Sequence, residues 1–515
     1  VCEGCGDCSD QSNCISVTPV ETEFGRKRRI DQSSCNKDFS CFNGFCPSFV
    51  TVYGGTPRKL GEMSGPAGGV VPAPRSPSLD QPYGIVITGI GGTGIITLGA
   101  LLGMAAHLEG KGCTVLDVTG LAQKNGAVVS YVRLAPRPED LHAVRVAAGG
   151  ADLLLGCDVV VAASPNALSR VQAGVTKAVI NSHIQPTAAF LFNPDIDFES
   201  PAMLHAIKTA AGDADVIDGT GLATALMGDS IATNLFMLGY AFQKGLVPLS
   251  FEAIEQAIVL NGVAVEANKR TFAWGRVAAH DRAQIETLVK PARQADAAPA
   301  ETLVERRAAV LTEYQNALYA QRYRETVAAI AAAESTRARG CTGLAEAAAR
   351  NLFKLMAYKD EYEVARLYTD GAFHAKLRQQ FEGELRLQFH LAPPILAARD
   401  GTGASRKRAF GSWMFYAFKL LARLRRLRGT AFDIFGYTRE RRMERQLIID
   451  YEAIMRELAT ALSPDNHALA IEIASLPEQI RGFGHIKQRN LERVKAREAE
   501  LLAMLRNVKA APSAA

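Results

Sequence analysis

Seven of the ten cysteines of this 515-residue chain lie within its first 46 residues. The first three have the spacing Cys2-x2-Cys5-x2-Cys8, and the last of the seven is followed by proline, Cys46-Pro47. This spacing is typical of iron–sulfur ligation, in which thiolates from one tight loop and a distant Cys-Pro bind a four-iron cluster. We therefore predict that Cys2, Cys5, Cys8 and Cys46 ligate one [4Fe–4S] cluster, which makes electron transfer the first functional hypothesis.

The rest of this segment predicts a second cluster. Cys35 and Cys41 are six residues apart, like the first and third ligands of a ferredoxin half, but the residue midway is Asp38. In two-cluster ferredoxins the fourth cysteine of each half serves the other cluster, so Cys14 would complete this set. A carboxylate is a harder ligand than a thiolate. We therefore predict that Asp38 or solvent binds the fourth iron, and that a three-iron form arises when this labile iron leaves.

Zinc and disulfide bonds are the alternatives for these cysteines. Structural zinc usually takes two Cys or His pairs that close one tetrahedron, and three thiols at this spacing fit a cluster better. A disulfide framework is typical of short secreted chains, whereas we find no signal peptide and no apolar run of about 18 residues. These features favour a cytoplasmic location. Cys113, Cys157 and Cys341 stand alone and are expected to be buried thiols.

Length and composition predict a multidomain α/β protein. A chain of this length forms roughly three to four domains, and 48% hydrophobic with 22% charged residues is ordinary globular composition. The net charge of +5 does not indicate a nucleic-acid partner. We expect a ferredoxin-like iron–sulfur domain over 1–53, a Gly/Pro-rich linker over 54–82, an α/β domain over 83–285 and a mostly helical region over 286–515. Because Val1 already lies inside a metal motif, we expect the chain to be part of a longer polypeptide or one subunit.

A glycine-rich loop opens the predicted α/β domain. A buried strand is expected over 84–88 and an apolar helix over 95–109, and between them lie Gly89, Gly91, Gly92 and Gly94. Glycines let a backbone approach a diphosphate, whose charge lies at the N-terminus of the following helix. The order strand, glycine loop, helix, strand is the context that a phosphate-binding loop requires.

Two further residues bear on the ligand of this loop. Asp117 ends the second predicted strand, 23 residues after Gly94, about where a ribose-binding acid belongs in a dinucleotide site. The loop therefore permits NAD or FAD, although this glycine spacing alone is a weak signal, and a strand-to-helix turn without a ligand stays open. Lys124, in the loop 123–126, is either a phosphate contact or a solvated turn lysine, and the sequence favours neither.

The remaining pattern of this region predicts a Rossmann-like, doubly wound, mostly parallel sheet with helices on both faces. Strands are predicted over 127–134, 158–163 and 176–181, and helices over 166–173, 200–211, 229–244 and 250–258. Asn181-Ser182-His183 ends one strand, where ligands bind in such folds. A lone histidine there is more often structural than catalytic, and no catalytic residue is identified.

A basic, aromatic stretch marks the helical C-terminal region. Residues 405–445 hold twelve Lys or Arg against three Asp or Glu, interleaved with aromatic residues that include Trp413, Tyr416 and Phe432. Stacking on single-stranded nucleic acid and an amphipathic helix on a membrane surface are the less favoured interpretations. We expect core aromatics with basic outer faces that pack on other domains or receive an acidic electron acceptor.

Two regions of the chain resemble one known family in order and in wording. The phrases VCEGCGDCSDQSNC, ETEFGRKRRIDQSSCNKDFSC and CPSFVTV come first, and GIGGTGIITLGALLGMAAHLEGK and GLAQKNGAVVSYVRL follow. Together they resemble the later part of a fused indolepyruvate ferredoxin oxidoreductase, of the thiamine-diphosphate-dependent 2-oxoacid:ferredoxin oxidoreductases. The resemblance covers about residues 1–280, and the helical region is similar to the tail of long fused members.

This resemblance implies a reaction and its partners. An arylpyruvate or related 2-oxoacid and coenzyme A would give acyl-CoA, carbon dioxide and two electrons for ferredoxin. The glycine-loop domain would be the gamma-type domain on the coenzyme A side, and the full enzyme would be a homodimer. Thiamine diphosphate and Mg²⁺ would bind domains upstream or on another chain, because we find no Gly-Asp-Gly run with a trailing Asn pair. Alone, the chain is expected to be inactive; the rival interpretations are an iron–sulfur subunit of an NAD- or FAD-linked oxidoreductase and a pure electron-transfer subunit.

Overall fold

The chain forms two compact units. The computed structural model describes residues 1–32, 35–58, 71–120, 126–184, 193, 195–196, 200–289, 303–392 and 407–510. The first unit comprises Val1–Arg29, Lys37–Arg58 and Ala297–Ala515, and the second comprises Ile30–Asn36 and Lys59–Asp296. The cysteine segment and the C-terminal helical region, which the sequence predicts as separate domains, therefore fall within the same unit.

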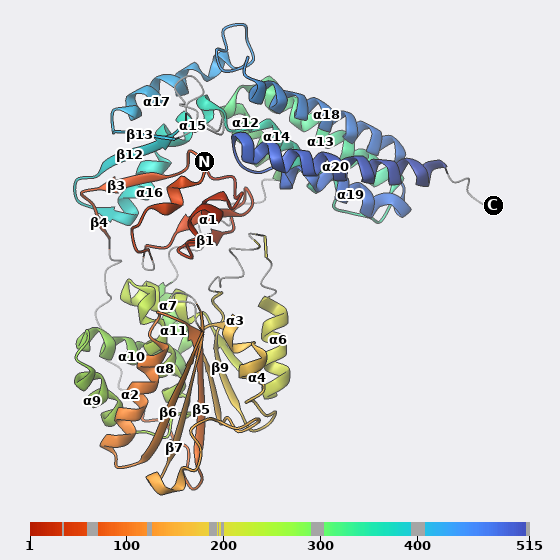
Figure 1. Ribbon diagram of the computed structural model, residues 1–515. Helices are drawn as coiled ribbons and strands as arrows, with labels where there is room; N and C mark the ends of the chain where they lie inside the picture. Colours follow the sequence, from red (N-terminus) through yellow and green to blue (C-terminus); the bar gives the residue numbers. More distant parts are fainter. Residues whose placement is uncertain are drawn as a thin grey trace, which may run out of the picture. The chain divides into compact units, whose positions relative to one another are not determined.

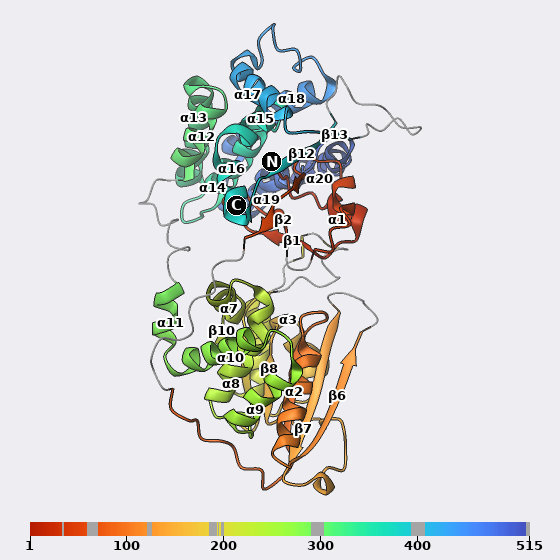
Figure 2. The same cartoon turned by 90° about the vertical axis from the view of Figure 1, so that its left-hand side faces the viewer.

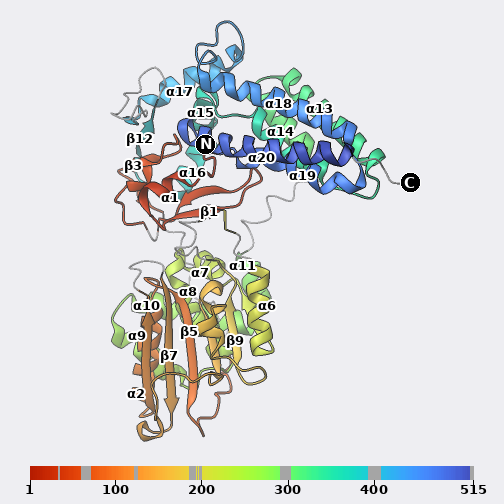
Figure 3. The ribbon, with the colours of Figure 1, turned by 45° about the vertical axis from the view of Figure 1, so that its right-hand side comes forward.

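The second unit is built on a six-stranded sheet (Figure 1, Figure 3). In spatial order the strands are β10 (Ala214–Ile217), β9 (Lys177–Asn181), β8 (Leu153–Gly156), β5 (Tyr83–Ile90), β7 (Ala127–Ala135) and β6 (Gly112–Thr119). β5, β8, β9 and β10 pair in parallel, whereas β7 pairs antiparallel with both β5 and β6. The mixed α/β class with a parallel sheet is confirmed, and the β6–β7 hairpin is an antiparallel addition to it.

One predicted strand is wrong. The apolar run Val159–Ala162 forms the short helix α3 and not a strand over 158–163. Asp158 Oδ1 accepts a hydrogen bond from Val161 N at 3.0 Å, which is an N-cap. The strand of this region lies earlier in the chain: it is β8, whose four residues are all buried. A short apolar run cannot be assigned to strand or helix from its periodicity, and here the cap decides.

Helices cover both faces of this sheet (Figure 1). Ile85 and Ile87 of β5 belong to a core shared with α2, α8 and α10, while Val86 and Ile90 belong to a core shared with α3 and α6. A strand buried on both faces explains the continuous apolar run in the sequence. The helices of the first face are α2 (Ile95–Leu108), α7 (Gly219–Met227), α8 (Thr233–Gln243), α9 (Phe251–Asn261), α10 (Val265–His280) and α11 (Arg282–Val289); those of the second are α3, α4 (Pro165–Leu168) and α6 (Ser200–Ala211).

The later part of the predicted linker runs along the second unit without forming a helix or strand until β5 begins. Val71 and Leu79 pack against its larger core. Gln243 Nε2 donates to Pro72 O at 2.8 Å, which ties this segment to α8. Residues 59–70 lie outside the described part of the chain.

The first unit combines the cysteine segment with strands from the far end of the chain. β3 (Val50–Tyr53) pairs antiparallel with β12 (Arg386–Leu391), which also pairs with β13 (Arg408–Phe410). β4 (Thr56–Pro57) pairs with β11 (Phe381–Glu382). Because the β3–β12 and β4–β11 ladders join residues more than 300 positions apart, the sequence pattern gives no local sign of them. The segment also contains α1 (Asp7–Ser12), β1 (Val17–Val20), β2 (Lys27–Ile30) and η1 (Ser40–Asn43).

Helices make up most of the first unit (Figure 1, Figure 2). One buried core joins α12, α13, α14, α18, α19 and α20, and a smaller one joins α15 and α17 to β12. Between them, Arg428 binds Asp360 through two hydrogen bonds of 2.5 and 2.8 Å. The helices are α12 (Leu303–Tyr314), α13 (Ala317–Arg337), α14 (Leu344–Met356), α15 (Glu361–Thr369), α16 (Ala372–Gln380), α17 (Met414–Arg423), α18 (Arg439–Ala461), α19 (His467–Ser475) and α20 (Gly484–Ala510).

The aromatic residues of the basic stretch divide into two groups. Phe418 and Phe435 are buried, as predicted. Trp413, Tyr416 and Phe432 are 60%, 75% and 77% exposed, so the prediction that they are core residues is wrong. Helix α17 directs Phe418 inward and leaves Tyr416 on its outer side, because only one stripe of a surface helix reaches the core. Trp413 is the N-cap residue just before this helix. None of the helices in the described part of the chain is long and apolar enough to span a membrane.

Candidate functional site

The glycine loop joins the end of β5 to the start of α2 at the carboxyl edge of the parallel strands. Gly91 N donates to Gly126 O at 2.7 Å, which binds the loop to the start of β7. Asn234 of α8 donates to Thr93 O at 2.7 Å and fixes the loop from the other side. Lys124, the predicted phosphate contact, lies outside the described residues.

The loop needs glycine for two different reasons. At Gly89 a Cβ would meet the Ile95 side chain at 2.4 Å, so this position is closed by packing. Gly92 and Gly94 have φ angles of 86° and 96°, which side chains rarely adopt. Both are exposed, and no atom lies within 4 Å of a Cβ built on Gly92. The outer half of the loop therefore presents bare backbone to a ligand.

Helix α2 begins directly behind this exposed backbone. Its N-cap is Gly94, which brings no side chain to accept from the first N–H groups of the helix. Uncapped N–H groups at the start of a 14-residue helix, with its dipole, favour an anion. The geometry therefore fits a phosphate or diphosphate group of a ligand.

Polar side chains from the neighbouring strand ends surround the loop's edge of the sheet. Asn181, at the end of β9, is 1% exposed. Its Nδ2 donates to Cys157 O at 2.9 Å and to Thr220 Oγ1 at 2.8 Å, and its Oδ1 accepts from His183 N at 3.2 Å. Asp218, after β10, caps α7 through Gly221 N at 2.9 Å. Asn181 thus acts as a brace between strand ends, and the structure assigns no catalytic role to His183.

The predicted ribose-binding acid does not occupy the position of a dinucleotide fold. Asp117 lies on β6, which pairs with β7 and not with β5. In dinucleotide-binding folds the acid belongs to the strand beside the glycine-loop strand. Here Asp117 Oδ1 is buried without a hydrogen-bond partner, close to Gly99 of α2. The strand order therefore weakens the NAD or FAD interpretation.

The four ligands predicted for the first cluster, Cys2, Cys5, Cys8 and Cys46, lie in the other unit, around a tight loop. Gly4 and Gly6 have φ angles of 71° and 85°, so the chain turns back between successive cysteines. Gly4 N donates to Cys2 Sγ at 3.3 Å. A Cβ on Gly44 would lie 2.7 Å from Cys8 Cα, so only glycine lets the later part of the segment approach this cysteine.

The thiols of these four cysteines lie within electrostatic reach of one another. Burial, followed by the thiols of Cys46, Cys2 and Cys5, raises the pKa of Cys8. Burial also raises the pKa of Cys5 to about 12, and it raises that of Cys46 against the opposing effect of Lys407. Buried thiols with raised pKa values become thiolates when a metal replaces their protons.

No three Cys, His, Asp or Glu side chains converge as ligands of a single ion in the described part of the chain. In a four-iron cluster each thiolate binds a different iron, so its ligands stand farther apart than those of one ion. The four interacting thiols and the glycine turns between them fit such a group.

The residues predicted for a second cluster are less clearly assembled. Cys14 and Cys41 are half-buried in the first unit, but Cys35 belongs to the stretch Ile30–Asn36 of the second unit. Asp38 Oδ1 accepts from Ser40 N at 3.1 Å and from Ser40 Oγ at 3.0 Å, as a turn-forming aspartate does. The second cluster stays a prediction.

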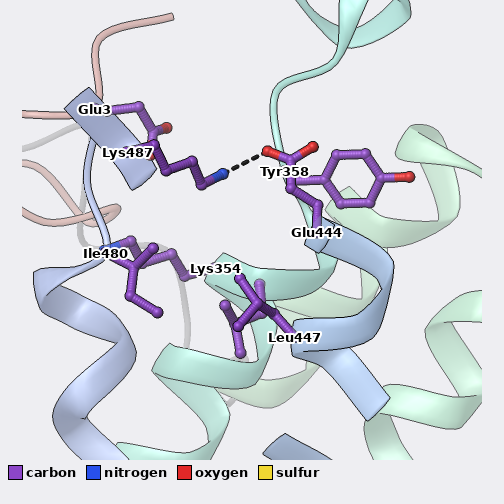
Figure 4. Close-up of a pocket in the computed structure, with 8 residues that line it drawn as sticks. Glu3, Lys354, Tyr358, Glu444, Leu447, Ile480 and Lys487 are labelled. Atoms are coloured by element: carbon purple, nitrogen blue, oxygen red, sulfur yellow. Dashed lines mark hydrogen bonds and ion pairs between the residues drawn. The ribbon is translucent and has the colours of Figure 1, made fainter. Parts of the chain in front are cut away.

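A buried charge cluster anchors the cysteine loop to the helices (Figure 4). Glu3 forms an ion pair with Lys359. Burial would raise the pKa of Glu3, but Lys359 and further lysines lower it to about 2. Lys487 of α20 binds Glu444 of α18 at 2.5 Å. The pocket among these groups, of about 10 Å³, has room for one water molecule only, so it is a structural joint.

Further contacts from the C-terminal region close over the cysteine segment. Tyr368 Oη donates to Pro47 O at 2.6 Å, and Lys407 Nζ donates to Phe42 O at 2.9 Å. Lys407 also acts electrostatically on Cys46, Cys8 and Cys41. In the sequence Lys407 stands out only as part of a basic run and Asn234 does not stand out at all, since nothing local marks contacts over such separations.

Two family models match the chain. Residues 84–278 match pyruvate ferredoxin/flavodoxin oxidoreductase, and residues 300–500 match a family of unknown function (DUF6537). The first match covers the six-stranded sheet, its helices and the glycine loop. The second covers most of the helices that enclose the cysteine segment.

Curated relatives agree with the first match. The indolepyruvate oxidoreductase subunits IorB of Thermococcus kodakarensis and Pyrococcus horikoshii are each 32% identical over 202 residues, which is 39% of this chain and 96% of each relative. A solved keto/oxoacid ferredoxin oxidoreductase gamma subunit from Geobacter sulfurreducens is 20% identical and covers 38% of this chain and 98% of its own. Its TM-score of 0.28 is too low to support an assignment.

The six-stranded sheet and the glycine-loop edge thus lie in the part of the chain that matches oxidoreductase subunits. The nearly complete coverage of the indolepyruvate oxidoreductase subunits shows that the chain belongs to the 2-oxoacid:ferredoxin oxidoreductase family.

Proposed function

We propose that this chain supplies the electron-transfer part and the coenzyme A side of a thiamine-dependent 2-oxoacid:ferredoxin oxidoreductase. Indolepyruvate or another arylpyruvate would be converted with coenzyme A to acyl-CoA and carbon dioxide, and two electrons would pass to ferredoxin. The observation that carries this proposal is the match of nearly the whole length of two indolepyruvate oxidoreductase subunits. Other subunits or domains would hold thiamine diphosphate and Mg²⁺.

In this proposal the glycine loop binds the diphosphate of coenzyme A. The exposed backbone at Gly92 and Gly94 approaches the phosphates, and the uncapped start of α2 stabilises their charge. Asn234 holds the loop through Thr93 O, so the N–H groups keep their direction. The loop thereby positions the thiol end of coenzyme A without forming a bond to it.

The cysteine segment would hold the electron carrier. Cys2, Cys5, Cys8 and Cys46 would ligate a [4Fe–4S] cluster, which when bound accepts and releases one electron at a time. The surrounding helices exclude water from Cys8, which is 6% exposed. The Lys407 ammonium near the thiolates favours the more negative, reduced state of such a group.

The test uses the anaerobically purified chain together with its thiamine-binding domains or subunit. Indolepyruvate, thiamine diphosphate and coenzyme A are added, and reduction of a viologen dye is followed beside low-temperature EPR spectra. We expect dye reduction that requires coenzyme A, with reduced-cluster signals. Clusters that stay oxidised with indolepyruvate, phenylpyruvate and pyruvate but are reduced by NADH would replace this proposal with a nucleotide-linked oxidoreductase.

A further inference from the structure

A large pocket opens beside the cysteine segment and is distinct from the thiol site. Its volume is about 640 Å³, within the range of small-molecule sites. Its lining comes from α1, η1, β3, β12, β13 and the start of α20, together with residues that flank these elements, all in the first unit, and includes no cysteine among the described residues. It therefore differs from both the thiol site and the water-sized joint of Figure 4.

The walls of the pocket are aromatic. Phe39, Phe42, Phe45 and Tyr53 line it, and Phe39 and Tyr53 are 44% and 42% exposed. Phe42 stacks on His390 with ring centroids 4.5 Å apart and an interplanar angle of 6°. Flat rings presented at one opening suit a flat aromatic ligand, which gains by stacking.

One of these rings is held there by an uncommon backbone conformation. Phe39 has a φ of 61°, in the left-handed region that bulky residues rarely adopt. Such conformations persist where the surrounding structure imposes them, and they are concentrated at binding sites. This backbone holds the Phe39 ring at the opening instead of in a core.

The charges of the pocket favour an anion. Its basic side chains are Lys407 and Arg408, its histidines are His390 and His485, and its one carboxylate is Asp7. Asp7 is 6% exposed, and its Oδ2 already accepts a hydrogen bond from Phe45 N at 2.6 Å. His390 is held by Thr51 Oγ1 at 2.8 Å, and burial together with Lys407 lowers its pKa, so it adds no charge near pH 7. The lysine, arginine and carboxylate groups thus sum to one positive charge, with Arg408 exposed to meet the ligand.

The pocket also adjoins the cysteines through the chain itself. Asp7 precedes Cys8, Phe42 follows Cys41, and Phe45 precedes Cys46. A ligand in the pocket would thus lie one residue away from three of the seven clustered cysteines without replacing any of them.

We propose that this pocket binds a planar aromatic molecule that carries a phosphate or carboxylate group, as flavin mononucleotide and small aryl carboxylates do. The rings of Phe39 and Phe42 stack on the aromatic system, and Arg408 and Lys407 pair with the anionic group. This site goes beyond the proposed oxidoreductase function and does not rest on it.

The test is a titration of the full chain, purified anaerobically, with flavin mononucleotide, followed by quenching of flavin fluorescence. Riboflavin, which has the ring without the phosphate, and indole-3-acetate as a competitor separate the contributions of ring and charge. We expect flavin mononucleotide to bind at least roughly fivefold more tightly than riboflavin, because charge-assisted hydrogen bonds add affinity. Displacement by indole-3-acetate would assign the site to aryl carboxylates as well, and its failure would restrict the site to the larger ring.

Matched variants locate the binding. Phe39→Ala and Arg408→Gln are each expected to weaken flavin mononucleotide roughly fivefold. Phe432→Ala and Lys419→Gln, which change an exposed aromatic and an exposed lysine outside the pocket, should leave it unchanged. Circular dichroism checks that each variant is folded. Absence of binding at millimolar flavin mononucleotide, or equal binding by all four variants, would overturn the proposal.

Discussion

Backbone forms the exposed surface of the glycine loop, whereas buried side chains form the surroundings of the cysteine segment. At Gly92 nothing lies within 4 Å of an added Cβ, and the polar groups on offer are N–H groups at the start of α2. At Cys8 the nearest backbone, that of Gly44, is so close that a Cβ would lie 2.7 Å from its Cα. The glycine loop is thus open at the surface, whereas the cysteine segment is closely packed around Cys8.

The two sites also differ in how far along the chain their parts lie. The glycine loop and its helix are consecutive, and a single distant residue, Asn234, braces them. The cysteine segment is completed by β12, Tyr368 and Lys407, more than 300 residues later. The ligand proposed for the glycine loop is exchangeable, and a local turn is enough to bind it. The cluster proposed for the cysteine segment is permanent and needs surroundings that exclude water. One short segment is too small to provide them.

The largest expected effect is at the cluster site proposed for the cysteine segment. Cys8→Ser should abolish the cluster proposed for Cys2, Cys5, Cys8 and Cys46, because serine does not replace a thiolate in the buried position. Iron and acid-labile sulfide analysis, with EPR of the reduced protein, measures the loss. Cys341→Ser is the matched control, since Cys341 lies outside the cysteine segment. If both variants keep the same iron content, the ligand assignment fails.

The second prediction concerns a buried ion pair among the helices of the first unit. Asp360→Asn keeps the side-chain acceptor that caps α15 but leaves the Arg428 charge buried without its partner. We expect a loss of about 3 kcal/mol in the free energy of unfolding of the first unit. Denaturant titration measures it. Glu305→Gln, which breaks the exposed pair with Arg324, should cost less than about 1 kcal/mol. If the two variants lose the same free energy of unfolding, the buried pair does not stabilise the first unit more than the exposed pair does.

A smaller effect is expected at the glycine loop. Gly92→Ala and Gly110→Ala both place alanine at a positive φ with free space around it, so each should cost about 1 kcal/mol of stability. Only Gly92 lies in the loop that faces the ligand, and only Gly92→Ala should weaken coenzyme A binding, by about tenfold. Isothermal titration calorimetry compares the two. Unchanged affinity in Gly92→Ala would remove the loop from the binding site.

The smallest effect is a pH dependence of the stability of the helical core of the first unit. Glu334 accepts from Leu344 N at 2.7 Å, Ala345 N at 3.0 Å and His467 Nε2 at 2.8 Å. Burial opposes ionisation, but these hydrogen bonds lower the pKa of Glu334 below its ordinary value. The stability that it contributes is therefore present above the unfolded pKa of about 4.3 and is lost as the pH falls through the folded value.

Melting temperatures between pH 6 and pH 3 test this dependence. The native chain should lose more stability on acidification than Glu334→Gln, which has no charge to lose. If the melting temperatures of the two proteins fall in parallel as the pH is lowered, Glu334 does not contribute to the acid sensitivity of the first unit.

Much of the second unit was predictable because its signals are local. The predicted strands over 127–134 and 176–181 and the helix over 200–211 match β7, β9 and α6 closely. The strand predicted over 158–163 is wrong, because an apolar run of four residues fits a helix as well as a strand. Asp117 has the right spacing from Gly94 for a dinucleotide site, but spacing along a chain does not give the order of strands in a sheet.

The sequence by itself supplied the predictions for the two sites: a cluster from thiols at iron–sulfur spacing, and a phosphate ligand from the glycine loop. These follow from residue type and short-range spacing, which act within one turn or loop. The tertiary structure alone decided that β7 separates Asp117 from β5, that Lys407 lies among the thiols, and that four aromatic rings form a pocket. Such contacts depend on which distant surfaces pack together, and packing is settled by the whole chain.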